Sequence, residues 1–270
     1  MILESIPATP PPDGPTGDDV TEDTLLGGRV RLLQPAQGYR AAIDPVLLAA
    51  ATPAAGADRV VDLGCGAGAA AFCLTARLDG VRVAGLEVQA AAADLARRNA
   101  ELNGVASRVR ITLGDTAQAP AHLPAGSDPD LVSGRFDHVM TNPPFYPGAR
   151  HTRSPRVGKA ASHGEGTADL ATWIAAAARL LAPRGTLTMI HRADRVDEIL
   201  ARLAGRFGAV VLYPLWPRAG VEAKRVIIRA RLGARSPARL LPGLVLHGEG
   251  GGYTPAAEAV LRDGAGLDFQ

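Results

Sequence analysis

Residues 59–68 read RVVDLGCGAG, an apolar run that leads into a turn of alternating glycines. A short apolar run bounded by turn residues is typical of a buried strand. Gly64, Gly66 and Gly68 let the backbone pass close to a ligand, and the helix that should follow would direct its N-terminus toward that ligand. The spacing is G-x-G-x-G, which differs from the G-x-G-x-x-G of dinucleotide binders. The stretch predicts a strand, a ligand-binding turn and a helix, in that order.

Strands and helices alternate along most of the chain. We expect helices at 67–78, 89–102, 169–181 and 194–206, and strands at 59–63, 81–86, 108–113, 136–140, 186–190, 210–215 and 225–232. This alternation predicts an α/β fold, with a doubly wound, mostly parallel, seven-stranded sheet between helices. The connection before the last strand is too short for a crossover helix, so this final strand should be antiparallel.

Composition indicates one domain, residues 24–270, after a disordered tail at residues 1–23 that is rich in Pro, Asp, Gly and Thr. Residues 1–24 hold six of the 27 acids and none of the 29 Lys and Arg, so the remainder carries a net charge of +8. A basic body suits a polyanionic partner, although arginine is also abundant in proteins of GC-rich genomes.

Neither a membrane span nor a signal peptide is evident, so we expect a cytoplasmic protein that does not enter a membrane. The two cysteines, Cys65 and Cys73, predict neither a disulfide framework nor a metal site. We interpret them as small apolar packing residues.

Acidic residues accompany the ends of the first three expected strands. Asp62 lies inside the first strand, Glu87 ends the second and Asp115 follows the third. In open α/β sheets, ligands bind at the carboxyl ends of the strands, where a carboxylate can take the hydroxyls of a ribose. Such acids also cap helices, so only their combination with the glycine turn is informative.

This combination resembles the cofactor site of class I S-adenosylmethionine-dependent methyltransferases, whose sheet is Rossmann-like. The resemblance implies that S-adenosylmethionine is the cofactor, with Glu87 on its ribose and Asp115 on its adenine amine. The turn with Gly64, Gly66 and Gly68 would line the methionine part, with Asp62 nearby.

The fourth strand runs into TNPPFY, residues 141–146. Neither proline has an N–H for a sheet, and a residue before proline is held extended, so the segment is rigid. It resembles the N-P-P-[FY] motif of enzymes that methylate an amine of adenine, cytosine or glutamine. Fixed acceptors on the two amine hydrogens favour a pyramidal nitrogen with a free lone pair. The expected catalytic residues are Asn142, whose side chain also borders the cofactor, Pro143 through its carbonyl, Pro144, and Phe145, which stacks on the base.

Segments that flank these two motifs indicate a particular family of amine methyltransferases. QPAQGYRAAIDPVLL (34–48), AASH (160–163) and AKRVIIRARLG (223–233) are similar to the small-domain methyltransferase family that includes the bacterial tRNA1(Val) adenine-37 N6-methyltransferase. The likeness implies that Tyr39, Arg40 and Asp44 border the cofactor pocket. The insert after TNPPFY and the stretch 244–266 depart from the best-known enterobacterial form, which leaves the RNA substrate open.

The insert, residues 147–166, is basic and contains glycine and proline. Because arginines grip phosphate, we expect RNA contacts there from Arg150, Arg153, Arg156, Lys159 and His163. A solvated loop without a ligand explains the same composition. Four basic residues alternate around the final strand, namely Lys224, Arg225, Arg229 and Arg231. They indicate either a surface stripe for RNA or the ordinary polarity of a strand.

Three hypotheses follow. The leading one is an adenine-N6 methyltransferase that acts on structured RNA, with tRNA as the foremost substrate. The second is a protein glutamine N5-methyltransferase of the release-factor type, which carries NPP[YF] but has a folded helical domain ahead of the cofactor motif, where this chain has only residues 24–58. The third is a protein that binds the cofactor without catalysis, or a structural partner. The intact Asn142 and the intact glycine turn argue against it.

Overall fold

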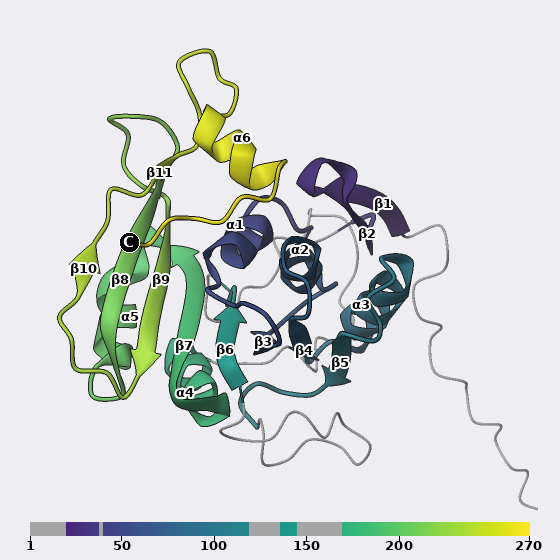
Figure 1. Cartoon of the computed structure of the whole chain (residues 1–270), viewed down its shortest axis with the longest axis horizontal. Coiled ribbons are helices and arrows are strands. Elements are labelled where there is room, and N and C mark those ends of the chain that lie inside the picture. Colours follow the sequence, from purple (N-terminus) through teal and green to yellow (C-terminus); the bar gives the residue numbers. More distant parts are fainter. Residues whose placement is uncertain (1–19, 38–39, 119–135, 145–168) are drawn as a thin grey trace, which may run out of the picture.

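A computed structural model describes residues 20–37, 40–118, 136–144 and 169–270 (Figure 1). The strands are β1 (Val20–Leu25), β2 (Val30–Pro35), β3 (Arg59–Leu63), β4 (Arg82–Glu87), β5 (Val109–Leu113), β6 (Phe136–Thr141), β7 (Leu181–Arg192), β8 (Phe207–Trp216), β9 (Arg225–Leu232), β10 (Arg239–Leu240) and β11 (Leu244–Val245). The helices are α1 (Asp44–Ala51), α2 (Ala69–Arg77), α3 (Ala90–Leu102), α4 (Leu170–Leu180), α5 (Val196–Leu203) and α6 (Pro255–Leu261), with short 3-10 turns η2 (Leu26–Gly28) and η3 (Ala193–Arg195).

The central sheet has the order β10-β8-β9-β7-β6-β3-β4-β5, and β11 also pairs with β8. Strands β3 to β7 pair in parallel, while β9 lies antiparallel between β7 and β8. The prediction of seven mostly parallel strands with an antiparallel last strand is therefore confirmed. The two-residue strands β10 and β11, which were not predicted, extend the edge beyond β8.

Helices cover both faces of this sheet (Figure 1). Residues of α1, α2 and α6 form one hydrophobic layer with the sheet, and residues of α4 and α5 form the other. The sequence of β3 explains why both layers exist. Val60 points into the first layer and Val61 into the second, and both are fully buried. A continuous apolar run such as RVVDL is suited to a central strand of this kind.

The first described element is a separate antiparallel hairpin, β1–β2, whose register runs from Val20 opposite Pro35 to Leu25 opposite Val30. Four residues of the tail predicted at 1–23 therefore belong to the folded domain, and the predicted boundary is wrong. The reason is electrostatic as well as geometric. Glu22 is ion-paired with Arg31 across the hairpin at 2.6 Å, and Asp23 is ion-paired with Arg40.

The predicted helices are present with ends displaced by a few residues. For example, α4 begins after Asp169, whose Oδ1 accepts a hydrogen bond from the Thr172 N–H at 2.9 Å. Helix α6, which Thr254 caps, was not predicted. Among the residues described, no helix combines the length and the apolar character that crossing a bilayer requires.

Candidate active site at the carboxyl edge of the sheet

Four parallel strands end side by side. Leu63 of β3 lies opposite both Leu86 of β4 and Thr141 of β6, and Glu87 lies opposite Leu113 of β5. The residues that follow these strands are therefore neighbours at one edge of the sheet. The structure thus brings together the glycine turn, Glu87 and the segments that hold Asp115 and Asn142.

The glycine turn is held by backbone hydrogen bonds to the neighbouring strand. The N–H groups of Gly64 and Cys65 donate to the carbonyl of Leu86 at 2.8 and 3.1 Å. Gly64, Gly66 and Gly68 all have positive φ, at 68°, 55° and 90°. This backbone conformation is open to glycine and costly for other residues.

Two of these glycines are required by packing, and the middle one faces open space. A Cβ on Gly64 would lie 2.4 Å from the ring of Trp173, and a Cβ on Gly68 would lie 2.4 Å from the ring of Phe72. A Cβ on Gly66 would meet no atom within 4 Å. A ligand can therefore approach the backbone at Gly66, beside the start of α2.

Glu87 is anchored to the turn by both of its carboxylate oxygens. Its Oε2 accepts from the Gly66 N–H at 2.8 Å, and its Oε1 accepts from the Gln89 N–H at 2.8 Å. The side chain is only 6% exposed. Each oxygen keeps a further lone pair for a donor such as a hydroxyl group.

Asp62 is a buried carboxyl group beneath the same turn, 2% exposed. Burial raises the pKa of Asp62 to about 7, against a hydrogen bond from the Ala71 backbone and with a smaller contribution from the charge of Glu87. Within the described residues, its Oδ2 has no hydrogen-bond partner. A cationic group at this position would satisfy Oδ2 and restore the ionised form.

The segment after β6 is fixed to β3. The Thr141 hydroxyl donates to the Leu63 carbonyl at 2.9 Å. Asn142 is half-buried with its Oδ1 shielded from solvent, Pro143 is buried and Pro144 is exposed. The prolines thus hold the Asn142 side chain and the Pro143 carbonyl at the end of β6, next to the glycine turn.

His191 and Trp173 are two neighbours of this edge that the sequence did not indicate. His191, on β7, is fully buried, and burial lowers its pKa, while the nearby carbonyl groups of Arg192 and Pro144 act in the opposite direction. Trp173 comes from α4 and packs on Gly64. No motif marks either residue, because each reaches the site only through the order of the strands and helices.

Other predicted site residues have contacts of their own. The Oδ1 of Asp115 accepts from the Ala117 N–H at 2.8 Å, and Arg40 bonds to the hairpin. Asp44, at the start of α1, accepts from Nε of Arg225 at 3.1 Å. The predicted contacts of Asp115, Arg40 and Asp44 with a cofactor stay predictions. Seven predicted residues lie outside the described residues, namely Tyr39, Phe145, Arg150, Arg153, Arg156, Lys159 and His163.

Two of the basic residues of β9 are used inside the fold. Arg225 pairs with Asp44, and the guanidinium group of Arg229 lies 4.3 Å from the ring centre of Phe269. Burial lowers the pKa of Arg229 to about 10. These two side chains therefore have structural contacts that a solvent-exposed RNA-binding stripe would not require. Across the described ranges, no three His, Cys, Asp or Glu side chains converge as a metal site.

The chain is similar to known methyltransferases. Residues 43–212 match the family model described as methyltransferase small domain. A tRNA1(Val) (adenine(37)-N6)-methyltransferase from Aeromonas hydrophila is 30% identical over 78% of this chain and 84% of that protein. A release factor glutamine methyltransferase from Chlorobaculum tepidum is 34% identical over 61% of this chain and 55% of that protein. A crystal structure titled as a predicted O-methyltransferase from Agrobacterium tumefaciens has a TM-score of 0.67 at 28% identity, covering 83% of this chain and 98% of that chain.

The lengths of the relatives differ. This chain spans 51% to 61% of the length of three of them, including the release factor enzyme and two tRNA1(Val) enzymes from Porphyromonas gingivalis.

Proposed function

This chain belongs to the methyltransferase small domain family, and we propose that it methylates the exocyclic N6 amine of adenine in tRNA, with S-adenosylmethionine as cofactor. The observation that carries the proposal is the position of Asn142 and Pro143. They follow β6 directly, one strand from the glycine turn. The match to a tRNA adenine methyltransferase over 84% of that protein supports the choice of substrate.

The residues at the carboxyl edge fit S-adenosylmethionine. The open side of Gly66 admits the ligand, and the anchored carboxylate of Glu87 can accept from its ribose hydroxyls. The buried Oδ2 of Asp62 suits the cationic amino group of the methionine part. When bound, S-adenosylmethionine supplies an activated methyl group, whose bond to sulfur breaks as its bond to the amine nitrogen forms.

The chain's own part in the reaction is to shape and hold the amine. The exocyclic nitrogen of adenine is a poor nucleophile because its lone pair is delocalised into the ring. Asn142 Oδ1 and the Pro143 carbonyl, aimed at its two hydrogens, favour the pyramidal nitrogen. The hydrogen bond from Thr141 to Leu63 keeps these acceptors in register with the cofactor turn. After transfer, the methylated nitrogen carries one proton more than in the product. This proton stays on the nitrogen, hydrogen-bonded to Asn142 Oδ1, until it passes to solvent, so no strong base is needed.

Methylation of a protein glutamine is the second candidate, because the release factor enzyme is 34% identical to this chain. A glutamine amide nitrogen is also planar and delocalised, so the same acceptors suit it. The extent of the matches favours RNA, because the match covers 84% of the Aeromonas hydrophila tRNA enzyme and 55% of the release factor enzyme.

Radiolabelled S-adenosylmethionine offered together with total tRNA, ribosomal RNA and release factors would separate the two candidates. We expect label in tRNA, at N6 of adenine after digestion to nucleosides. Label confined to protein glutamine would contradict the RNA proposal.

Asn142→Ala tests the amine-holding role. Loss of one preorganised transition-state contact should reduce kcat by about 100-fold or more. The Kd for S-adenosylhomocysteine should stay within about twofold, since the cofactor is held chiefly by other residues. A variant that transfers methyl groups at close to the wild-type rate would show that Asn142 does not hold the amine.

A further inference from the structure

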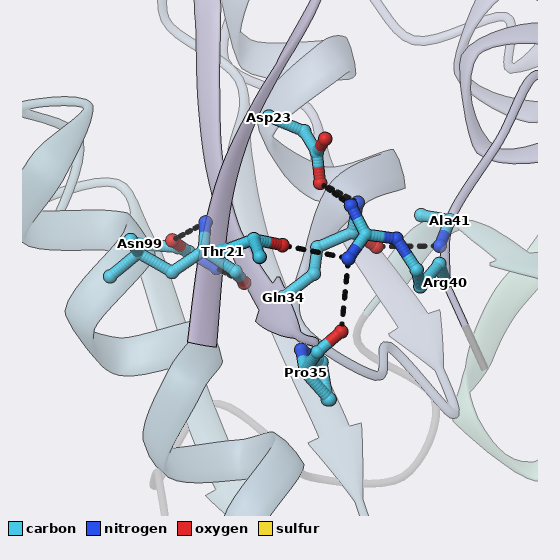
Figure 2. A network of polar contacts seen from close by, with 8 residues as sticks. Thr21, Asp23, Gln34, Pro35, Arg40, Ala41 and Asn99 are labelled. Carbon is cyan, nitrogen blue, oxygen red and sulfur yellow. Dashed lines mark hydrogen bonds and ion pairs between the residues drawn. The ribbon is translucent and has the colours of Figure 1, made fainter. Parts of the chain in front are cut away.

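Asn99 of α3 is fully buried and joins three parts of the molecule. Its Oδ1 accepts from the Leu33 N–H at 2.7 Å, and its Nδ2 donates to the carbonyls of Leu33 and Ala67, both at 3.0 Å. Figure 2 shows the side chain reaching the backbone of the hairpin. Leu33 belongs to β2, and Ala67 stands between Gly66 and Gly68. One amide therefore links α3, the hairpin and the glycine turn.

The hairpin docks on α3 through a ladder of two asparagines. Asn103, one helical turn after Asn99, binds Arg31 in the same way, with the Arg31 N–H on Oδ1 at 2.9 Å and Nδ2 on the Arg31 carbonyl at 2.7 Å. Asn99 and Asn103 are four residues apart, which corresponds to about 6 Å along a helix axis. This distance is close to the length of two residues along a strand, which is the separation of Arg31 and Leu33. The two amides thus replace a neighbouring strand along one edge of β2, while β1 pairs with the other edge.

The hairpin also holds the segment that leads to α1 (Figure 2). Gln34 accepts from the Ala41 N–H at 2.6 Å and donates to Asp23 at 2.9 Å. Arg40 donates to the Thr21 hydroxyl at 2.7 Å and is ion-paired with Asp23. The hairpin is therefore a fixed frame, tied to the domain at several points, and Asn99 is the side chain that extends it to the glycine turn.

We propose that Asn99 is a positioning residue for the cofactor site, which it serves by fixing the Ala67 carbonyl against the hairpin. This inference rests on the proposed function. Ala67 lies between two glycines of positive φ, so the local sequence alone restrains the turn weakly. The Asn99 bond restrains it from outside and keeps the Gly66 N–H directed at Glu87. The hairpin is then part of the cofactor site, and order in one stabilises order in the other.

Asn99→Ala and Asn103→Ala form a matched pair for the test. Each removes two hydrogen bonds to β2, and only the first also removes the bond to Ala67. By calorimetry, the Kd for S-adenosylhomocysteine should increase about tenfold in Asn99→Ala and less than twofold in Asn103→Ala. The KM for S-adenosylmethionine should follow the Kd, with kcat changed little. Equal Kd values for the two variants would overturn the positioning role.

Hydrogen exchange of the wild-type protein gives a test that does not depend on how the variants fold. S-adenosylhomocysteine should slow exchange of the Leu33 N–H, because Asn99 joins Leu33 to the glycine turn that the ligand is proposed to contact. Exchange that is unchanged by saturating ligand would overturn the coupling and leave the proposed function intact. A wild-type protein that does not bind the ligand at all would overturn the proposed cofactor and this role together.

Discussion

Cofactor affinity should decrease below about pH 7, because Asp62 takes up a proton in that range. Burial raises the pKa of this carboxyl group to about 7. The amino group of S-adenosylhomocysteine stays cationic from about pH 5.5 to about pH 8.5, and a cation beside Asp62 favours its ionised form. At low pH, binding must therefore displace a proton from Asp62, and the apparent affinity falls.

The size of the effect follows from the ionised fraction of Asp62 in the free protein. At about pH 5.5, roughly 1.5 units below the pKa, about 3% of the molecules carry the carboxylate, so Kd should be about 30-fold weaker than at about pH 8.5. That ratio corresponds to about 2 kcal/mol.

The contribution of Asp62 to the stability of the fold changes with pH in the opposite direction to cofactor affinity. Because the folded pKa lies above the ordinary value of 3.8, the contribution of Asp62 to stability is complete below that value and is lost as pH increases through about 7.

Calorimetric titration with S-adenosylhomocysteine between about pH 5.5 and about pH 8.5 measures the first effect, and Asp62→Asn is its control. This variant cannot ionise, so its Kd should be weak and nearly independent of pH. Without ligand, its Tm at about pH 8 should exceed that of the wild type, because a buried charge has been removed. A wild-type pH dependence that persists in Asp62→Asn would refute the reasoning and assign the titration to another group, such as His138 or His191, whose pKa values burial lowers.

Two further predictions concern the glycine turn and the thiols. Gly64→Ala should lower the free energy of unfolding by about 1–3 kcal/mol, because its Cβ would overlap the ring of Trp173, whereas Gly66→Ala should chiefly weaken binding of S-adenosylhomocysteine. Thermal unfolding and calorimetry of the two variants would show the contrast, and equal losses of stability would contradict it. Cys65 and Cys73 should not react with a disulfide reagent at neutral pH until the protein is unfolded, because both are buried and burial raises both pKa values, that of Cys73 to about 12. Rapid labelling of the native protein would refute this.

The parallel strands could be predicted because each has a complete local pattern. The run RVVDL has apolar residues on both faces and a glycine turn after it, which leaves few alternatives to a central strand. The place of β9 between β7 and β8 could not be predicted in the same way. The short connection before β9 indicates antiparallel pairing with β8 and does not specify the second neighbour.

Strand β1 of the hairpin was missed because its pattern depends on partners elsewhere. β1 reads VTEDTL, and its acidic residues are typical of a solvated tail when taken alone. Arg31 and Arg40 neutralise two of them, and α3 supplies the outer edge of β2 through Asn99 and Asn103. The spacing of those two asparagines, four residues apart on an alanine-rich helix, is a signal in the sequence that fits this docking.

The residues of the candidate site also fall into those with a local sequence pattern and those without one. Asp62, Glu87 and Asn142 could be placed because strand ends in a parallel sheet meet at one edge, and each residue stands at or next to such an end. Asn99 and Trp173 could not, because each acts on the glycine turn from a helix that is distant in sequence. The residues proposed to contact the ligand follow the strand pattern, whereas the residues that contact the turn from α3 and α4 depend on tertiary packing.

The hairpin also changes the charge that the protein presents to a polyanion. Counted by sequence, residues 1–24 are an acidic segment ahead of a basic body. In the structure, Glu22 and Asp23 are ion-paired with Arg31 and Arg40, so the hairpin adds little net negative field close to the site. Residues 20–270 contain 23 acids and 29 Lys and Arg, a net charge of +6. An excess of this size would attract a polyanion such as RNA over a range set by salt, and the proposed function leaves the choice of the methylated base to close contacts at Asn142 and Pro143.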